Sequence, residues 1–376
     1  MSVESAPLKK EHTHSFEMIE TTSQLGEFLD QFKATDGQRL RCAVDTEADS
    51  LHSYQEKLCL IQFSCEGVHA IIDPLAIDAE GMTPLLRFLE TSEVWMHGAD
   101  FDMWMFRKAY GWIPPLVLDT QVAARLVGYT QFGLAHMVEQ HFGVVLSKQS
   151  QRADWGRRPL PEKMLDYAIN DVLYVVALAD KLLARIRELG REAWFEESCE
   201  ASRTNVLARL GPDPEQVWRI PGWGKLHPRG LAYLCEIWGW RDKESERMNR
   251  PPFKVIVNEQ LLELAEALQG GGDPVLHKRF SDVQRRRYQR AIERARRLPE
   301  NELPKRRLHT RREKPANLDD AVGKLRAKRD RLAQELEIDP TLIATRGTLE
   351  AIALDRETGL AQLMNWQRDL LLAEDE

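Results

Sequence analysis

Long apolar runs, paired cysteines and an overall positive charge are all missing from this 376-residue chain. No segment approaches the roughly 18 consecutive apolar residues that argue for a transmembrane helix. The first residues, MSVESAPLKKEHTHSFE, lack the apolar stretch of a secretory signal. The five cysteines are odd in number and never spaced as CxxC, which argues against a disulfide framework and against a structural zinc site. We therefore expect a cytoplasmic protein with no membrane partner.

The net charge of −7 argues against a nucleic-acid-binding surface that covers the whole chain. The charges are segregated, however, because Arg and Lys crowd the segment from residue 278 to residue 331. The densest runs are Arg285-Arg286-Arg287, Arg296-Arg297, Lys305-Arg306-Arg307 and Arg311-Arg312. A solvated helical face and a contact surface for a polyanion explain this clustering equally well.

The N-terminal half alternates strand and helix patterns. Residues 40–74 contain three apolar runs, LRCAVDTE, LCLIQFS and VHAIIDP, and their close spacing predicts antiparallel strands. Further along, segments with helical spacing alternate with the short strand patterns EVWMHG and PLVLD. One long helix is expected from Pro161 to about Gly190, after a polar, basic loop at residues 146–160. This order predicts a mixed sheet flanked by helices.

The C-terminal half, from about Arg203, shows no strand pattern and consists of helical segments separated by Pro and Gly. A stretch rich in Pro and charge, LPENELPKRRLHTRREKPANLDD, divides it in two. We therefore predict an α/β domain at residues 16–202, followed by two small all-helical domains at residues 203–298 and 299–376. Residues 1–15 are expected to be disordered.

Asp45 and Glu47 stand two residues apart in the first strong strand pattern. Side chains alternate across a sheet, so both carboxylates point to the same side. Two neighbouring carboxylates repel each other unless a cation or solvent compensates, and hard oxygen ligands suit Mg²⁺ or Mn²⁺. A pair of solvated surface acids explains the same spacing, and taken alone it is the more frequent arrangement.

Four further candidates lie in or directly before helical segments. Asp171 follows Tyr167 by four residues, which puts a phenol and a carboxylate on one helix face, one turn apart. Asp102 opens a helix after a short strand, where it, like Asp100, is alternatively explained as a helix cap. His97, just before this helix, suits a structural role better than that of a ligand or base.

Taken in order, these segments resemble the three exonuclease motifs of the DEDD superfamily. The motifs are DTE in a strand, H-x-x-x-x-D at the start of a helix and Y-x-x-x-D in a later helix, and the Tyr marks the tyrosine branch. The segments DTEADSLHSYQEKLCLIQFS, LDTQVAARLVGY, SKQSQRADWGRRPL and YAINDVLY further resemble the bacterial ribonuclease D family. The resemblance implies a ribonuclease-H-like catalytic domain.

The C-terminal half extends this resemblance. The segment VWRIPGWGKLHPRGLAYLCEIWGWRD resembles an HRDC domain, a helical module that ribonuclease D shares with RecQ-type helicases. A second HRDC-type domain is expected after about residue 301 from its position, length and helical character. Most of Trp218, Trp223, Trp238 and Trp240 are assigned to the cores of these modules.

The resemblance implies a 3′–5′ exoribonuclease that releases 5′-mononucleotides by two-metal catalysis with Mg²⁺ or Mn²⁺. Asp45, Glu47 and Asp171 would hold one cation. Asp45 would also bridge to the second, with Asp102 contributing mainly through water. Tyr167 would orient the attacking water, because a phenol with a pKa of about 10 is a poor base at neutral pH.

RNA is the implied partner, with tRNA precursors as the substrate class typical of the family. We expect a monomer with no obligate protein partner. The loop at residues 147–158 precedes the tyrosine helix, so it is predicted to lie over the active site. Trp155 would offer a stacking face for a base and nearby arginines would offer phosphate contacts. The candidate substrate-binding residues are Thr46, Gln151, Arg152, Trp155 and Arg158, with Arg157 as a further phosphate contact.

Two alternatives remain. A 3′–5′ DNA exonuclease of the same superfamily would use the same chemistry, although the sequence holds neither a GxxxxGK[ST] P-loop nor a polymerase-sized region. A catalytically inactive nucleic-acid-binding relic is disfavoured because all four acids and the tyrosine are present.

Overall fold

The computed structural model describes residues 15–35, 37–147, 149–305 and 317–373. The chain forms two compact units. Unit 1 comprises residues 1–48, 58–208 and 315–376, and unit 2 comprises residues 49–57 and 209–314. Apart from Ser15, the residues predicted to be disordered at the N-terminus lie outside the described part, as do residues 306–316 of the predicted linker. None of the described helices combines the length and the apolar composition needed to cross a bilayer.

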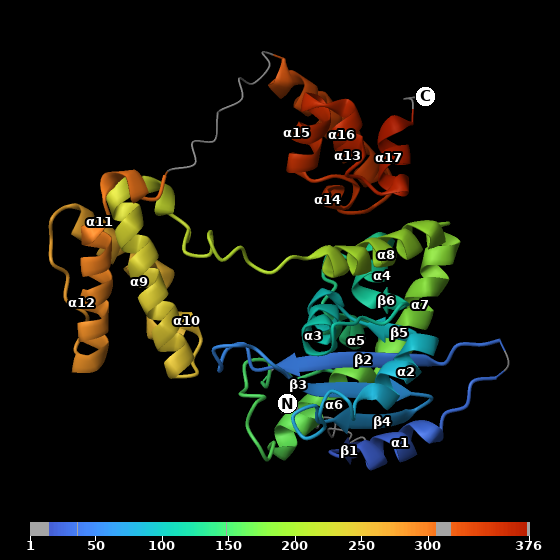
Figure 1. The fold of residues 1–376 in the computed structure, drawn as a ribbon. Coiled ribbons are helices and arrows are strands. Elements are labelled where there is room, and N and C mark those ends of the chain that lie inside the picture. Colours follow the sequence, from blue (N-terminus) through green and yellow to red (C-terminus); the bar gives the residue numbers. More distant parts are fainter. Residues whose placement is uncertain (1–14, 36, 148, 306–316, 374–376) are drawn as a thin grey trace, which may run out of the picture. The chain divides into compact units, whose positions relative to one another are not determined.

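A mixed six-stranded sheet forms the centre of unit 1 within the described residues, in the order β1-β4-β3-β2-β5-β6 (Figure 1). β2, β3 and β4 pair in antiparallel fashion, whereas β1, β5 and β6 each pair in parallel with their neighbour. The predicted antiparallel start and mixed sheet are therefore confirmed. The strands are β1 (Glu17–Ile19), β2 (Arg41–Ala48), β3 (Leu58–Cys65), β4 (Val68–Ile72), β5 (Glu93–Met96) and β6 (Val117–Asp119).

Helices cover both faces of this sheet, and β2 alternates between the two cores. Cys42 and Val44 join the core that contains α1, α2 and α3, whereas Ala43 joins the core that contains α4, α6 and α7. Figure 1 shows α6 beside the sheet, where it packs on β2, β3 and β4. The helices are α1 (Thr22–Asp30), α2 (Thr83–Thr91), α3 (Asp100–Tyr110), α4 (Thr120–Val127), α5 (Leu134–Phe142), α6 (Glu162–Leu173), α7 (Val175–Glu188) and α8 (Glu192–Ala208).

The single long helix predicted from Pro161 to Gly190 is wrong, because the chain breaks at Tyr174. Tyr174 has φ −104° and ψ −7°, which departs from helical values and separates α6 from α7. The break lets the two helices pack on different neighbours. α6 lies on β2–β4, whereas α7 packs against α4, α5, β2 and β5.

The C-terminal helices belong to unit 1 and are tied to α8. Trp194 stacks on Trp366 with ring centroids 4.8 Å apart. Glu197 accepts hydrogen bonds from the backbone N–H groups of Asn365 and Trp366, at 2.7 and 3.2 Å. Buried Arg191 donates to the carbonyl oxygens of Leu126 and Leu336. These helices are α13 (Leu318–Glu335), α14 (Pro340–Ile343), α15 (Arg346–Leu354), α16 (Arg356–Leu360) and α17 (Asn365–Leu372).

Unit 2 is helical, as its sequence predicts, and starts later than expected, because the predicted boundary at residue 203 falls inside α8. Trp218 and Trp240 are buried in its core, and Trp223 and Trp238 pack against that core. The segment 49–57 joins this unit, since the Tyr54 hydroxyl donates to Asp242 Oδ1 at 3.0 Å. The elements are η1 (Trp223–Lys225), α9 (Pro228–Arg247), α10 (Pro252–Val255), α11 (Asn258–Gln269), α12 (Asp282–Arg297) and η2 (Glu300–Glu302).

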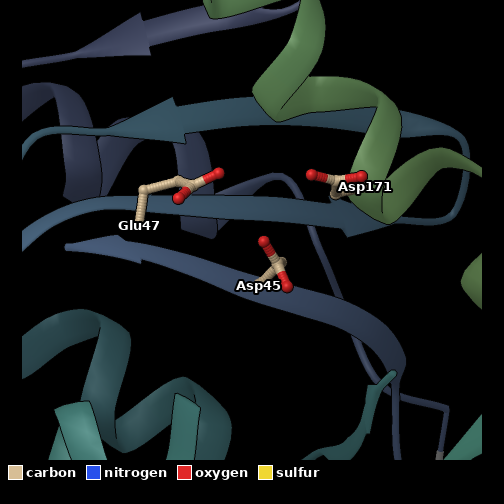
Figure 2. A group of neighbouring side chains, drawn as sticks. All are labelled: Asp45, Glu47 and Asp171. Atoms are coloured by element: carbon tan, nitrogen blue, oxygen red, sulfur yellow. The ribbon is translucent and has the colours of Figure 1, made fainter. Parts of the chain in front are cut away.

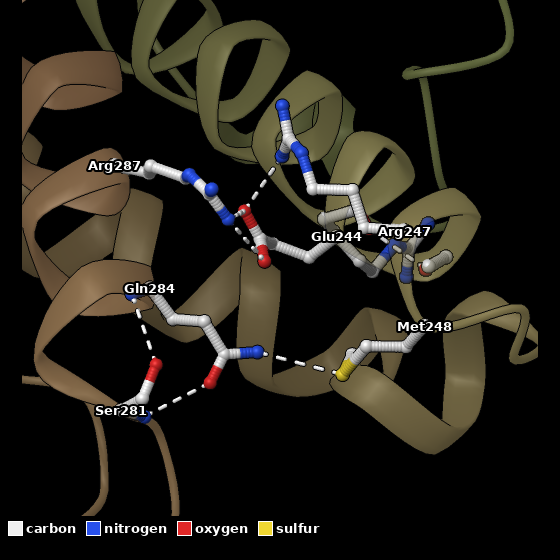
Figure 3. Close-up of polar contacts among 8 residues, drawn as sticks. Glu244, Arg247, Met248, Ser281, Gln284 and Arg287 are labelled. Carbon is white, nitrogen blue, oxygen red and sulfur yellow. Dashed lines mark hydrogen bonds and ion pairs between the residues drawn. The ribbon is translucent and has the colours of Figure 1, made fainter.

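Ion pairs fix α12 against α9 in unit 2. Buried Glu244 of α9 pairs with Arg247 of its own helix and with Arg287 of α12, at 2.7 and 3.1 Å (Figure 3). Ser281 caps α12, because it accepts from the Gln284 backbone while the Gln284 side chain accepts from the Ser281 N–H. Arg287, from the basic run Arg285-Arg286-Arg287, therefore stabilises the packing of α12 on α9.

Candidate active site

Asp45, Glu47 and Asp171 form an acidic cluster at the surface of the sheet. Asp45 and Glu47 lie in β2 on the same side as Ala43, as their two-residue spacing predicts. Asp171 lies in α6, which packs over this face. One carboxylate oxygen from each residue lies within 4.8 Å of the others, and the three side chains converge in Figure 2.

Tyr167 lies one turn before Asp171 in α6, as the sequence spacing predicts. Its hydroxyl is hydrogen-bonded to the Asp171 carboxylate. Burial and the charges of Asp171, Glu47 and Asp45 raise the pKa of the Tyr167 phenol above its ordinary value. The phenol is therefore protonated at neutral pH and can donate a hydrogen bond, but it cannot act as a general base.

Asp102 lies in the first turn of α3, outside the group of three. Its Oδ1 accepts a 2.6 Å hydrogen bond from the Thr46 hydroxyl, and both side chains are buried. Thr46 was predicted to contact substrate, and this stays a prediction; in the structure its hydroxyl proton is donated to Asp102. His97 lies at the end of β5 and hydrogen-bonds through Nδ1 to the Thr120 hydroxyl at 2.9 Å, in keeping with a structural role.

Burial and mutual repulsion raise the pKa values of these acids. The pKa of Asp45 is raised well above its usual range by burial and by the charges of Asp102, Asp171 and Glu47. The pKa of Glu47 rises to about 9 for the same kind of reason. Burial raises the pKa of Asp102 to about 7, although the hydrogen bond from Thr46 acts in the opposite direction and lowers it. Burial likewise raises the pKa of Asp171 to about 7, although the hydrogen bond from Tyr167 lowers it.

This arrangement fits a divalent cation. Carboxylate oxygens are the ligands that Mg²⁺ and Mn²⁺ prefer, and the cluster offers three of them within reach of one ion. Burial first, and then repulsion between the acids, raises the pKa values of Asp45 and Glu47, so their charged forms are unfavourable without a compensating cation. A bound cation would remove this repulsion, whereas a surface pair of acids would need no such compensation.

Two of the predicted substrate contacts are engaged within the protein instead. Trp155 is 1% exposed and lies 6.1 Å from the Tyr167 ring, so its face is not open to a base. The Arg158 guanidinium pairs with buried Asp73 and also donates to the carbonyl oxygens of Cys59, Trp155 and Arg157. These contacts use its hydrogen-bond donors, which corrects the prediction of a phosphate contact. Both side chains anchor the loop that leads into α6.

The other loop candidates remain accessible. Gln151, Arg152 and Arg157 are exposed on the segment before α6. Asp73, by contrast, was not singled out from the sequence, because its partner Arg158 lies 85 residues away. Gln62 was also missed. The only sequence signal was an isolated amide inside the apolar run LCLIQFS.

Comparisons with known proteins point to one family. A family described as 3′–5′ exonuclease matches residues 16–187. Ribonuclease D of Gluconacetobacter diazotrophicus is 31% identical over 340 residues, which cover 87% of this chain and 84% of that protein. Ribonuclease D of Escherichia coli is 28% identical over 381 residues, which cover 96% and 97% of the two chains.

Solved structures show similarity over most of the chain. The crystal structure of Escherichia coli RNase D, described as an exoribonuclease involved in structured RNA processing, matches with a TM-score of 0.67 and 25% identity over 90% of each chain. A protein from Bifidobacterium adolescentis matches with a TM-score of 0.78 at 21% identity over 94% of each chain, which supports the fold alone. The similarity thus includes the helical C-terminal half.

Proposed function

Because this chain belongs to the ribonuclease D family and is a 3′–5′ exoribonuclease, we propose that it hydrolyses RNA to 5′-mononucleotides with two divalent cations. The convergence of three carboxylates and a protonated tyrosine on one face of the sheet carries this proposal. The acidic cluster would hold one cation. Asp45 would be shared with the second, and Asp102 would contribute through water.

The cations and the side chains around them would have separate roles in hydrolysis. Bound cations supply a water of lowered pKa and stabilise negative charge on the leaving 3′ oxygen. The single O–H of Tyr167 is shared with Asp171 in the metal-free protein. It would turn to the attacking water and orient it once a cation takes up that carboxylate, since the raised pKa keeps the phenol protonated. Thr46 would keep Asp102 in place through its 2.6 Å hydrogen bond.

The helical C-terminal half would bind the rest of the RNA, as two HRDC-type modules, one formed by α9–α12 of unit 2 and one by α13–α17 of unit 1. Four of the seven arginines of α12 are already paired. Arg285, Arg287, Arg294 and Arg297 pair with Asp282, Glu244, Glu236 and Glu293 respectively. Arg286 and Arg290 are exposed, and no ion pair forms at either of them within the described part of the chain. They lie one turn apart on one helix face, where they would contact phosphates.

RNA with a 3′ tail, such as a tRNA precursor, is the proposed substrate class. Exposed Gln151 and Arg152 on the loop before α6 would contact it near the acidic cluster. A monomeric state and a cytoplasmic location stay predictions from the sequence.

One assay tests the proposal against DNA hydrolysis. RNA and DNA of matched sequence, labelled at the 5′ end, are incubated with the full chain and Mg²⁺, Mn²⁺ or EDTA. We expect RNA to shorten from the 3′ end with release of 5′-mononucleotides, and EDTA to stop the reaction. Equal degradation of DNA would instead favour the DNA exonuclease, and binding without cleavage under both metals would identify an inactive relic.

The matched control is Asp45→Ala, which removes the carboxylate that both cations would share. It should abolish cleavage while the protein remains folded, as judged by circular dichroism. Turnover close to that of the wild-type protein would overturn the assignment of the acidic cluster as the active site.

A further inference from the structure

Gln62 is a buried amide directly beside the acidic cluster. It lies in β3 opposite Asp45 of β2, and opposed residues of an antiparallel pair have side chains on the same face. The side chain of Gln62 is fully buried, with 0% exposure. α6, which carries Asp171, packs over β2 and β3 on this face. The amide therefore lies between the strand and the helix that supply the cluster.

The amide of Gln62 has no partner for either of its polar atoms in the described part of the chain. Ser64 provides a contrast, because it lies on the same face of the same strand and its hydroxyl hydrogen-bonds to His69 Nδ1 at 2.9 Å. Buried amides are almost always hydrogen-bonded, since leaving them unpaired in a core costs free energy. An apolar residue at position 62 would avoid that cost.

The surroundings of Gln62 indicate where a partner would be. On the side away from β2, Gln62 faces Ile71 of β4, and its same-face neighbour in β3 is Leu60. Both are buried and apolar, and α6 adds Ala168 and Val172 to the same core. In β2 the opposed residue is Asp45. Polar partners for the amide are thus expected at the acidic cluster.

We propose that Gln62 is a positioning residue of the metal site, whose carboxamide hydrogen-bonds to water bound by the cation beside Asp45. This inference rests on the proposed function. Partners beyond the direct ligands orient a metal site, and their loss typically lowers metal affinity about 10- to 100-fold. In the metal-free protein the same amide is a source of instability, because its polar atoms are unpaired.

The test compares Gln62→Leu and Gln62→Met with the wild-type full chain. Both variants replace the amide with an apolar side chain of similar size, and Met adapts to small changes of shape. Mn²⁺ affinity is measured by isothermal titration calorimetry, and the melting temperature is measured in EDTA. We expect about a 10-fold or greater loss of Mn²⁺ affinity together with an equal or higher melting temperature of the metal-free protein.

Ser64→Ala is the matched control, since it removes a buried polar group that already has a partner. It should lower the melting temperature in EDTA and leave Mn²⁺ affinity unchanged. Unchanged Mn²⁺ affinity in both Gln62 variants would overturn the proposal. So would a loss of affinity accompanied by a lower melting temperature in both, because a disturbed core would then be the cause. If the wild-type protein itself bound no Mn²⁺, the metal site would fail rather than the role of Gln62.

Discussion

The hydroxyl of Thr46 donates a 2.6 Å hydrogen bond to Oδ1 of Asp102, and this bond links β2 to α3 where both side chains are buried. Thr46 stands between Asp45 and Glu47, so the DTE motif supplies two acids for the cluster and one donor for the fourth acid. The middle residue of the motif thus has a physical role of its own.

Thr46→Val keeps the shape of the side chain and removes this donor. We expect about a 10- to 100-fold loss of kcat for RNA hydrolysis, which is typical for groups that orient metal-site residues. Thr46→Ser retains the hydroxyl and should restore most of the activity. Equal activity of the Val variant and the wild-type protein would show that Asp102 needs no positioning by this bond.

Tyr167→Phe removes the hydroxyl that is hydrogen-bonded to Asp171. Because loss of precise positioning at a reacting centre can cost about 10²-fold, kcat should fall by roughly that factor. Mn²⁺ affinity should survive, since the carboxylates are untouched. Single-turnover kinetics and calorimetry separate the two effects, and a parallel loss of metal affinity would assign Tyr167 to the metal site itself.

The metal-free protein should lose stability as the pH rises. Glu47 has a pKa of about 9, and Asp102 and Asp171 have pKa values of about 7. Between an unfolded value of about 4 and these values, the folded protein holds protons that the unfolded chain has released. Raising the pH through this window therefore favours unfolding.

Thermal melts in EDTA between pH 5 and pH 9 measure this effect. The melting temperature should fall as pH increases, and Mg²⁺ should reduce the fall because a cation replaces the protons. Glu47→Gln, which cannot ionise, should flatten the profile in EDTA. A melting temperature that stays level or rises with pH would show that the acids do not repel one another in the folded protein.

The basic face of α12 should set the salt dependence of RNA binding. Replacing exposed Arg286 and Arg290 with Gln removes two phosphate contacts, so the slope of log affinity against log salt should become smaller by about 1.4 for single-stranded RNA. Arg287→Gln is a different test, because this residue pairs with Glu244 and its loss should lower the melting temperature. An unchanged slope in the double variant would place the RNA elsewhere.

The sequence predicts the acidic cluster because its signals are local. Asp45 and Glu47 share a face through strand alternation, and Asp171 and Tyr167 share one through helical spacing, so both pairs are visible in a few residues. The partners of the buried polar groups are not local. Thr46 meets Asp102 across 56 residues, and Arg158 meets Asp73 across 85. Spacing rules contain no information on such pairs.

The fold, too, is predictable where the sequence signals are local and not where distant segments pack together. Alternating patterns predict β2 to β6 and the helices between them, whereas the break at Tyr174 depends on where α6 and α7 pack. The prediction that Trp155 stacks on a base was wrong because a large aromatic residue in a polar loop can equally become an anchor beneath it. Burial of that ring is decided by Tyr167 and α6, not by the loop sequence.

The contacts between α8 and the N-terminal end of α17 have a consequence for the synthesis of the chain. Trp194 and Glu197 find their partners only at residues 365–366, after the whole of unit 2 has been synthesised. At the usual speed of translation this delay is on the order of ten seconds. During that time unit 2 can fold, because most of it is the continuous segment 209–314. Trp194 on α8 does not yet have Trp366 to cover it. The nascent chain therefore passes through a stage at which chaperones that bind exposed apolar surface have a defined target.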